Sequence, residues 1–226
     1  MNSTLVNLLA SACAVIVGIV VHESAHALAA YALGDKTARS RGRVSLNPLA
    51  HVDPFGTVLL PLLMLAAGGP VFAFAKPVPV YLGNLKHPKR DEIIVSLAGP
   101  VSNIVLAGIG ALILKGTLGG LYKFAGFDTA YMLTSFSVTF ISVNLSLAFF
   151  NLIPIPPLDG SSIAVLILRG RALETYYRIQ PYAMPILIVV LYLLPQLIGL
   201  DLIGLYLGAT AYPIAQALIG FALKGF

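Results

Sequence analysis

Long runs of apolar residues alternate with short polar segments along the whole chain. A bilayer core of about 30 Å is crossed by roughly 20 apolar residues in a helix. Five runs are candidates for such crossings, at residues 4–33, 92–114, 133–153, 183–198 and 202–222. The pattern predicts an all-α polytopic membrane protein with five to six transmembrane helices and a re-entrant or broken segment.

The broken segment is a sixth apolar stretch, residues 56–75. Its sequence GTVLLPLLMLAAGGPVFAFA contains Pro61 and the run Gly68-Gly69-Pro70, and both residue types weaken a helix interior. Basic residues cluster in three polar segments, near 36–43, 86–90 and 169–178. Such clusters mark the cytoplasmic side of a membrane protein. A single crossing by the sixth stretch would leave the middle cluster outside, so we favour a re-entrant hairpin, with a true sixth helix as the alternative.

The composition agrees with a membrane protein and excludes other classes. Of the 226 residues, 58% are hydrophobic and only 10% are charged, whereas about 25% of a soluble domain is charged. The net charge of +5 comes from basic residues in short loops, which argues against a nucleic acid partner. A single cysteine, Cys13, excludes an intrachain disulfide and a CxxC metal pair.

The first apolar run contains a pattern with its own chemistry, His22-Glu23-x-x-His26. Residues four apart lie on one face of a helix, so the two imidazoles can bind one zinc ion while Glu23 acts as general base. Charged residues within a membrane helix cost roughly 2.5–3.5 kcal/mol, which makes a chance match improbable. Counting about ten residues to the helix end near Gly34 puts the site about 15 Å from the cytoplasmic end.

Two histidines need a third metal ligand, and the spacing alone leaves it open. The extended pattern HExxHxxGxxH fails, because Ala29 and Ala32 stand where glycine and histidine would be. Four later residues are candidates: His51, Asp53, His87 and Asp159. Asp159 follows a proline-rich break at the cytoplasmic end of the 133–153 helix, where a short carboxylate can turn back towards the core, although an ordinary Asp-Gly turn would explain it too.

Taken together, these motifs resemble the site-2 protease family of intramembrane zinc metalloproteases. The resemblance covers about residues 15–165 and rests on HESAHALAAYALGD, GRVSLNPLAHVDPFGTVLLP, FAKPVPV, SLAGPVSN and NLIPIPPLDG, in the family's order. Without an inserted PDZ domain, the sequence resembles the compact bacterial and archaeal branch of that family. The resemblance implies that His22, His26 and Asp159 bind the zinc ion and that Glu23 is the catalytic base.

The resemblance also implies roles for two asparagines and a place in the cell. Asn151 matches a residue that binds substrate or the oxyanion, and Asn103 is a second polar residue facing the site. Either side chain can donate a hydrogen bond to an oxyanion, or instead link helices within the membrane. One zinc ion per chain, a transmembrane protein substrate and a prokaryotic inner or plasma membrane are expected, with the active site nearer the cytoplasm.

The expected organisation is a catalytic core at residues 1–165 and a C-terminal transmembrane hairpin at 166–226. The expected reaction is hydrolysis of a peptide bond within or near a transmembrane segment of a membrane-tethered protein. Since an extended substrate can be held by strand addition, the stretch GRVSLNP, residues 42–48, is predicted to form a short β-strand. The oligomeric state is left open.

Two other functions remain as alternatives. A zinc or proton transporter would use intramembrane histidine, glutamate and aspartate as transport ligands, but it should carry polar residues through both halves of the bilayer. The outer half of the first apolar run, LLASACAVIVGIV, is apolar instead. A catalytically inactive membrane-binding homologue should have lost Glu23 or a ligand, and all of these are present.

Overall fold

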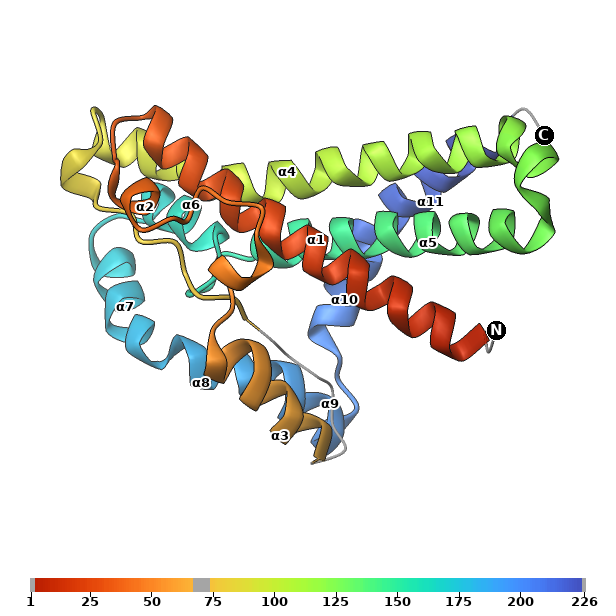
Figure 1. The fold of residues 1–226 in the computed structure, drawn as a ribbon. Helices are drawn as coiled ribbons and strands as arrows, with labels where there is room; N and C mark the ends of the chain where they lie inside the picture. Colours follow the sequence, from red (N-terminus) through yellow and green to blue (C-terminus); the bar gives the residue numbers. More distant parts are fainter. Residues whose placement is uncertain (1–2, 67–73, 225–226) are drawn as a thin grey trace.

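The computed structural model describes residues 3–66 and 74–224, and that part of the chain consists of helices joined by loops and turns, with no strand (Figure 1). The α-helices are α1 (Ser3–Ala32), α2 (Thr37–Ser40), α3 (Leu60–Ala66), α4 (Pro88–Gly116), α5 (Tyr122–Asn151), α6 (Gly160–Ile167), α7 (Arg171–Ile179), α8 (Ala183–Ile188), α9 (Leu194–Ile198), α10 (Leu202–Ala209) and α11 (Ala211–Leu223). Shorter 3-10 and π-helical turns join several of them, such as Pro54–Leu59 before α3.

Helices α1, α4 and α5 pack against one another and form the centre of the molecule, with α11 against α4 and α5 (Figure 1). Small residues line these contacts. Ala107 and Ala111 of α4 and Ala211 and Ala215 of α11 are buried in one cluster with Ile141 of α5. In a membrane, small side chains let helix backbones approach closely and gain van der Waals contact, since the hydrophobic effect does not drive apolar helices together there.

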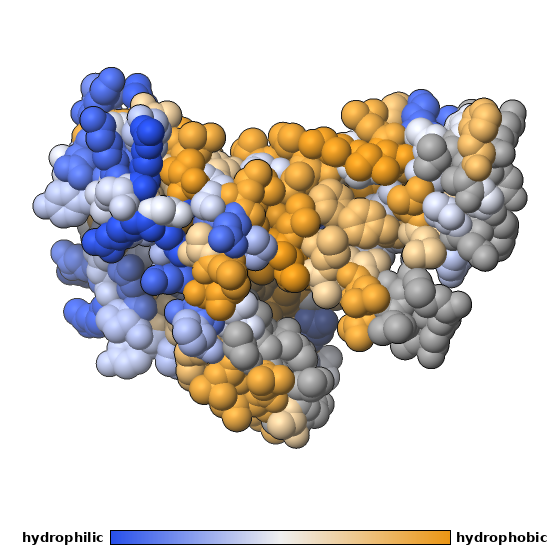
Figure 2. Space-filling view, in the orientation of Figure 1, coloured by the Kyte–Doolittle hydropathy of each residue, from blue (hydrophilic) through white to orange (hydrophobic). Residues whose placement is uncertain are grey.

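Five helical segments are long and apolar enough to cross a membrane within the described part of the chain: Leu8–Ala32, Pro88–Gly120, Thr129–Asn151, Arg171–Ile198 and Leu202–Leu223. Each contains one of the five runs predicted from the sequence or most of it. The surface over the middle of the molecule is hydrophobic, whereas hydrophilic residues gather at one end (Figure 2). The chain is therefore an integral membrane protein.

The two ends of the irregular stretch at 56–75 lie next to each other in space. The Phe74 amide donates to the Gly56 carbonyl at 3.0 Å, and the Thr57 hydroxyl donates to the Phe74 carbonyl at 2.9 Å. The predicted break at Gly68-Gly69-Pro70 lies outside the described residues. These bonds hold the two described ends of the stretch next to each other, an arrangement that a re-entrant hairpin requires.

The predicted β-strand at 42–48 is wrong, because the described residues contain no strand. Hydrogen bonds from and to side chains hold this segment in another conformation. The Ser24 hydroxyl and the His51 ring both lie on the Ser45 carbonyl, at 2.5 and 2.7 Å. The buried Arg43 guanidinium donates to the carbonyls of Ala50, Lys76 and Pro77. These bonds hold the segment as a folded loop against α1 and the 76–77 backbone.

The polar end of the molecule carries α2, the start of α4, α6 and α7, so the three basic clusters gather there (Figure 1). Asp35 joins the end of α1 to the segment that precedes α4. Its buried carboxylate accepts hydrogen bonds from the amide and hydroxyl of Thr37, the Tyr81 amide and the Asn84 side chain. Burial raises the pKa of this carboxyl, but the bonds from Asn84, Thr37 and Tyr81 outweigh it and lower the pKa to about 2.

Candidate metal centre

The two histidines of the HExxH pattern lie one helical turn apart on α1. The local sequence HESAHALAAYA is rich in alanine, the strongest helix former, and Ala27 and Ala30 are fully buried against neighbouring helices. His22 and His26 therefore project from one face, with ring centroids 4.6 Å apart, and each is only 7% exposed.

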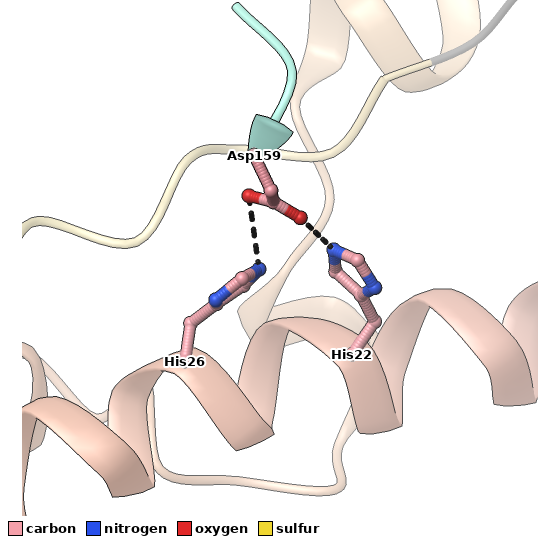
Figure 3. Close-up of side chains that lie close together, drawn as sticks. All are labelled: His22, His26 and Asp159. Carbon is pink, nitrogen blue, oxygen red and sulfur yellow. Dashed lines mark ion pairs between the residues drawn. The ribbon is translucent and has the colours of Figure 1, made fainter. Parts of the chain in front are cut away.

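Asp159 reaches this face from the loop that follows α5. Pro154, Pro156 and Pro157 prevent the helix from continuing, because proline removes a backbone donor and clashes with the preceding turn. Gly160 allows the loop to fold tightly, since a Cβ atom there would lie 2.2 Å from the Leu152 carbonyl oxygen. The chain then enters α6 with the Asp159 side chain directed at α1 (Figure 3).

Three possible metal ligands converge at this point. The Nε2 atom of His22 lies 3.1 Å from Oδ2 of Asp159, and Nε2 of His26 lies 3.3 Å from Oδ1 (Figure 3). The ligand atoms all lie within 4.8 Å of one another. Zinc bound by imidazole nitrogen and carboxylate oxygen, at about 2.0–2.2 Å from each, requires a cluster of this size.

Hydrogen bonds on the far side of each ring fix which nitrogen faces the aspartate. Nδ1 of His26 lies 2.7 Å from the Val95 carbonyl, which can only accept, so Nδ1 carries the proton. Nδ1 of His22 lies 2.6 Å from Oδ1 of Asn103, whose amide nitrogen faces the Gly18 carbonyl. In the neutral rings both Nε2 atoms therefore present lone pairs to Asp159.

The resulting set of three acceptors fits a cation. Asp159 Oδ2 is buried and receives no hydrogen bond from the described residues, although it lies beside His22 Nε2. Burying the two Nε2 lone pairs against a carboxylate, with no donor between them, costs free energy. A divalent metal ion would bind both nitrogens and the carboxylate at once. His22, His26 and Asp159 would hold such an ion, and a fourth position remains for water or substrate.

Helix α4 passes so close to the two imidazoles that only glycine fits at position 99. A Cβ atom on Gly99 would lie 2.4 Å from Nε2 of His26 and 2.6 Å from Nε2 of His22. Such distances are far inside van der Waals contact. The α4 backbone thus forms one wall of the site.

Glu23 lies between the two histidines in sequence and is half-buried beside them. It lies near His26, His22, Asp159 and His51 and so belongs to the same site. Among the described contacts its carboxylate has no hydrogen bond or ion pair with the protein. The carboxylate thus remains available for a water molecule, as a general base requires.

Of the other residues named from the sequence, Asn103 bonds a ligand, whereas the hydrogen bonds of Asn151 and Asp53 described here go to other partners. Asn151 donates to the Leu147 carbonyl of its own helix at 2.9 Å and is half-buried. His87 is an exposed residue at the start of α4, and Asp53 caps the turn at Phe55 and Gly56. Asn103 contacts His22, as described above, and is fully buried.

His51 is buried beside α1 without joining the ligand cluster. Its Nε2 atom lies 2.7 Å from the Ser45 carbonyl and 3.4 Å from the Ser24 hydroxyl. The ring thereby fastens the loop after α2 to the residue next to Glu23.

Sequence reasoning missed two residues that shape the site, Gly99 and Asn144. Asn144, fully buried on α5, accepts a hydrogen bond from Asn103 at 2.9 Å. A signal existed for Asn144, because a polar residue inside a membrane helix marks an interior-facing position. Gly99 carried no comparable signal beyond its place in the SLAGPVSN motif.

Fold and site together define a class: an integral membrane protein in which two histidines and an aspartate form a candidate metal centre inside the helical bundle. Residues 10–194 match the sequence profile of peptidase family M50. The chain belongs to this family, the family of the site-2 proteases, as its motifs predicted. None of the solved structures matches the chain significantly.

Curated bacterial relatives agree with this family. A Bacillus subtilis (strain 168) protein named "Putative zinc metalloprotease YwhC" is 46% identical over 149 residues, which are 66% of this chain and 64% of that protein. A Mycolicibacterium smegmatis protein named "Putative zinc metalloprotease Rip2" is 35% identical over 146 residues, 64% of this chain and 52% of that protein. A Mycobacterium tuberculosis (strain H37Rv) protein of the same name is 30% identical over 185 residues, 81% of this chain and 66% of that protein. The chain thus matches less than two thirds of each relative's length.

Proposed function

We propose that this protein is an intramembrane zinc metalloprotease that hydrolyses peptide bonds within or near transmembrane segments of membrane-tethered proteins. The observation that carries the proposal is the convergence of His22, His26 and Asp159 beside Glu23, on a helix long enough to span the bilayer. A hydrolytic site at that position acts on a bond that is itself in the membrane.

The proposed cofactor is one zinc ion per chain, held by His22, His26 and Asp159. Two imidazoles and one carboxylate with an open fourth position are a donor set of catalytic zinc sites. Zinc, when bound, activates water and polarises the scissile carbonyl. Hydrogen bonds from Nδ1 of each histidine to Asn103 and Val95 keep the rings oriented for this binding.

Glu23 acts as the general base and then as the general acid. Its carboxylate takes a proton from the attacking water and returns a proton to the leaving amine nitrogen, so the proton balance closes over one turnover. Asn151 is the proposed substrate-binding and oxyanion residue. One N–H of its amide donates to Leu147, which leaves a second N–H to donate to the developing oxyanion.

The substrate is proposed to be a transmembrane protein whose helix unwinds locally, because a helix hides its carbonyls in its own hydrogen bonds. We place the site nearer the cytoplasmic side of a prokaryotic inner or plasma membrane. The basic residues gathered at the polar end support this orientation by the positive-inside rule. Residues 1–165 are assigned as the catalytic core and 166–226 as a hairpin of the same membrane domain.

Replacing Glu23 with glutamine tests the proposal, because the amide keeps the shape of the side chain but cannot accept a proton. Membrane proteins of cells that express Glu23→Gln are compared with those of wild-type cells by quantitative proteomics. At least one single-span protein should accumulate uncut in the variant cells. The same protein, reconstituted with purified wild-type enzyme in liposomes, should be cleaved, and a zinc chelator or Glu23→Gln should reduce the rate at least 100-fold.

A transporter predicts a different result in the same liposomes. Wild-type protein would then move zinc or protons across the bilayer, and no membrane protein would be cut in either strain. Cleavage by Glu23→Gln at the wild-type rate would show that Glu23 is not the general base.

A further inference from the structure

A chain of hydrogen bonds runs from the metal centre to a third helix that contributes no ligand. Asn144 of α5 and Asn103 of α4 are both fully buried, in a bundle that otherwise packs mainly small and apolar side chains. A buried amide costs free energy unless its donors and acceptor are all paired. Two such residues in contact call for an explanation beyond helix packing.

The direction of this chain is fixed at its far end. Nδ2 of Asn144 donates at 2.9 Å to the Phe140 carbonyl, and a backbone carbonyl cannot donate in return. Oδ1 of Asn144 therefore faces Asn103 and accepts from its Nδ2 at 2.9 Å. Oδ1 of Asn103 is left to face Nδ1 of His22 at 2.6 Å. Each hydrogen bond thus determines whether the next atom in the chain donates or accepts.

Close packing at Gly18 keeps the three helices in this arrangement. The Gly18 carbonyl accepts from Nδ2 of Asn103 at 3.2 Å, a longer bond than the one to Asn144. A Cβ atom on Gly18 would lie 2.8 Å from Cδ1 of Leu147 and 3.0 Å from Oδ1 of Asn144. The absence of a side chain there brings α1, α4 and α5 together at the level of the two amides.

We propose that Asn144 is a positioning residue for the metal centre, because it orients the Asn103 amide and through it holds the proton of His22 on Nδ1. With Asn144 in place, both hydrogens of Asn103 Nδ2 are used and the amide cannot turn over. If the amide turned, its nitrogen would face Nδ1 of His22 and favour the ring form with the proton on Nε2, and Nε2 could then no longer bind a metal ion beside Asp159. The inference rests on the proposed zinc site.

A double-mutant cycle on zinc affinity tests this role. Wild type, Asn103→Ala, Asn144→Leu and the double variant are purified in detergent and stripped of metal. Zinc is then titrated against a chromophoric competitor. Asn144→Leu should weaken zinc binding about tenfold, the lower end of what removal of an outer hydrogen-bond partner costs. The double variant should match Asn103→Ala within about twofold, because Asn144 acts only through Asn103.

Two results would overturn the proposal: zinc affinity within twofold of wild type in Asn144→Leu, or the same further loss when Asn144→Leu is added to Asn103→Ala. Failure of wild-type protein to bind zinc would instead reject the metal site itself. Ser137→Ala is the matched control, since Ser137 is buried on α5 and bonds the Leu133 carbonyl of its own helix. Its zinc affinity should equal that of wild type.

A milder change keeps the test valid if the leucine variant does not fold. Asn144→Ser retains a hydroxyl that bonds its own helix but is too short to hold the Asn103 amide. Its melting temperature without metal reports on folding. The same cycle with serine should again show loss of zinc affinity only when Asn103 is present, and equal losses with and without Asn103 would contradict the proposal.

Discussion

The absence of a side chain at Gly99 leaves the room that the two imidazoles of the candidate metal centre occupy. A methyl group there would overlap both imidazoles, with 2.4 Å to Nε2 of His26. Because those nitrogens are the proposed ligand atoms, Gly99→Ala should displace them and weaken zinc binding by at least tenfold. Zinc titration of the purified, metal-free protein measures this loss.

Gly108 provides a control on the same helix. A Cβ atom at Gly108 meets nothing within 4 Å, so Gly108→Ala should leave zinc affinity unchanged while favouring the α4 helix by up to about 1 kcal/mol. If Gly99→Ala bound zinc as tightly as Gly108→Ala, the α4 backbone would not form a wall of the site.

Single residues were predictable from the sequence where their geometry is local. His22 and His26 are four apart on one helix, so their shared face follows from helix periodicity alone. Asp159 was one of four candidates, and only the family resemblance singled it out. Gly99 and Asn144 act through contacts between helices distant in sequence, and no local pattern contains such contacts.

At the scale of elements, Asp35 fastens the end of α1 to the segment before α4. Its pKa is lowered from 3.8 to about 2 in the folded protein, so the ionised carboxylate stabilises the fold at pH values above about 4. This stabilisation should be lost as the pH falls from about 4 towards 2. Asp35→Asn should lower the melting temperature at pH 6 and reduce its dependence on pH in that range.

The measurement is thermal unfolding of both proteins in detergent between pH 2 and pH 6. The difference between wild type and Asp35→Asn should be largest at pH 6 and shrink below pH 4. A difference that stays constant over this range would show that the charge of Asp35 does not support the junction.

A helix or strand could be predicted from the sequence where a single local quantity determines it. Hydrophobic length is the main determinant of a membrane helix, and each of the five predicted runs lies wholly or mostly in a helical segment long enough to span. The prediction of a strand at 42–48 was wrong because the conformation of this segment depends on side chains outside it. Ser24 and His51 bond the Ser45 carbonyl, which a neighbouring strand would otherwise have bonded.

At the scale of the whole molecule, three helices carry the polar site into an apolar bundle. Helix α1 supplies two of the proposed ligands and the proposed general base, α4 supplies the glycine wall, and the loop after α5 supplies Asp159, the third proposed ligand. The hydrophilic end seen in Figure 2 gives the bundle one polar side. Family M50 membership agrees with this architecture.

The central claim is that His22, His26 and Asp159 bind one zinc ion, and X-ray absorption spectroscopy of zinc-loaded protein tests it most directly. Metal analysis should give one zinc per chain. The spectrum should show nitrogen and oxygen ligands at about 2.0–2.2 Å with the scattering of two imidazoles, and of one imidazole in His26→Ala. A sulfur ligand, six oxygen ligands, or an unchanged imidazole count in His26→Ala would contradict the account.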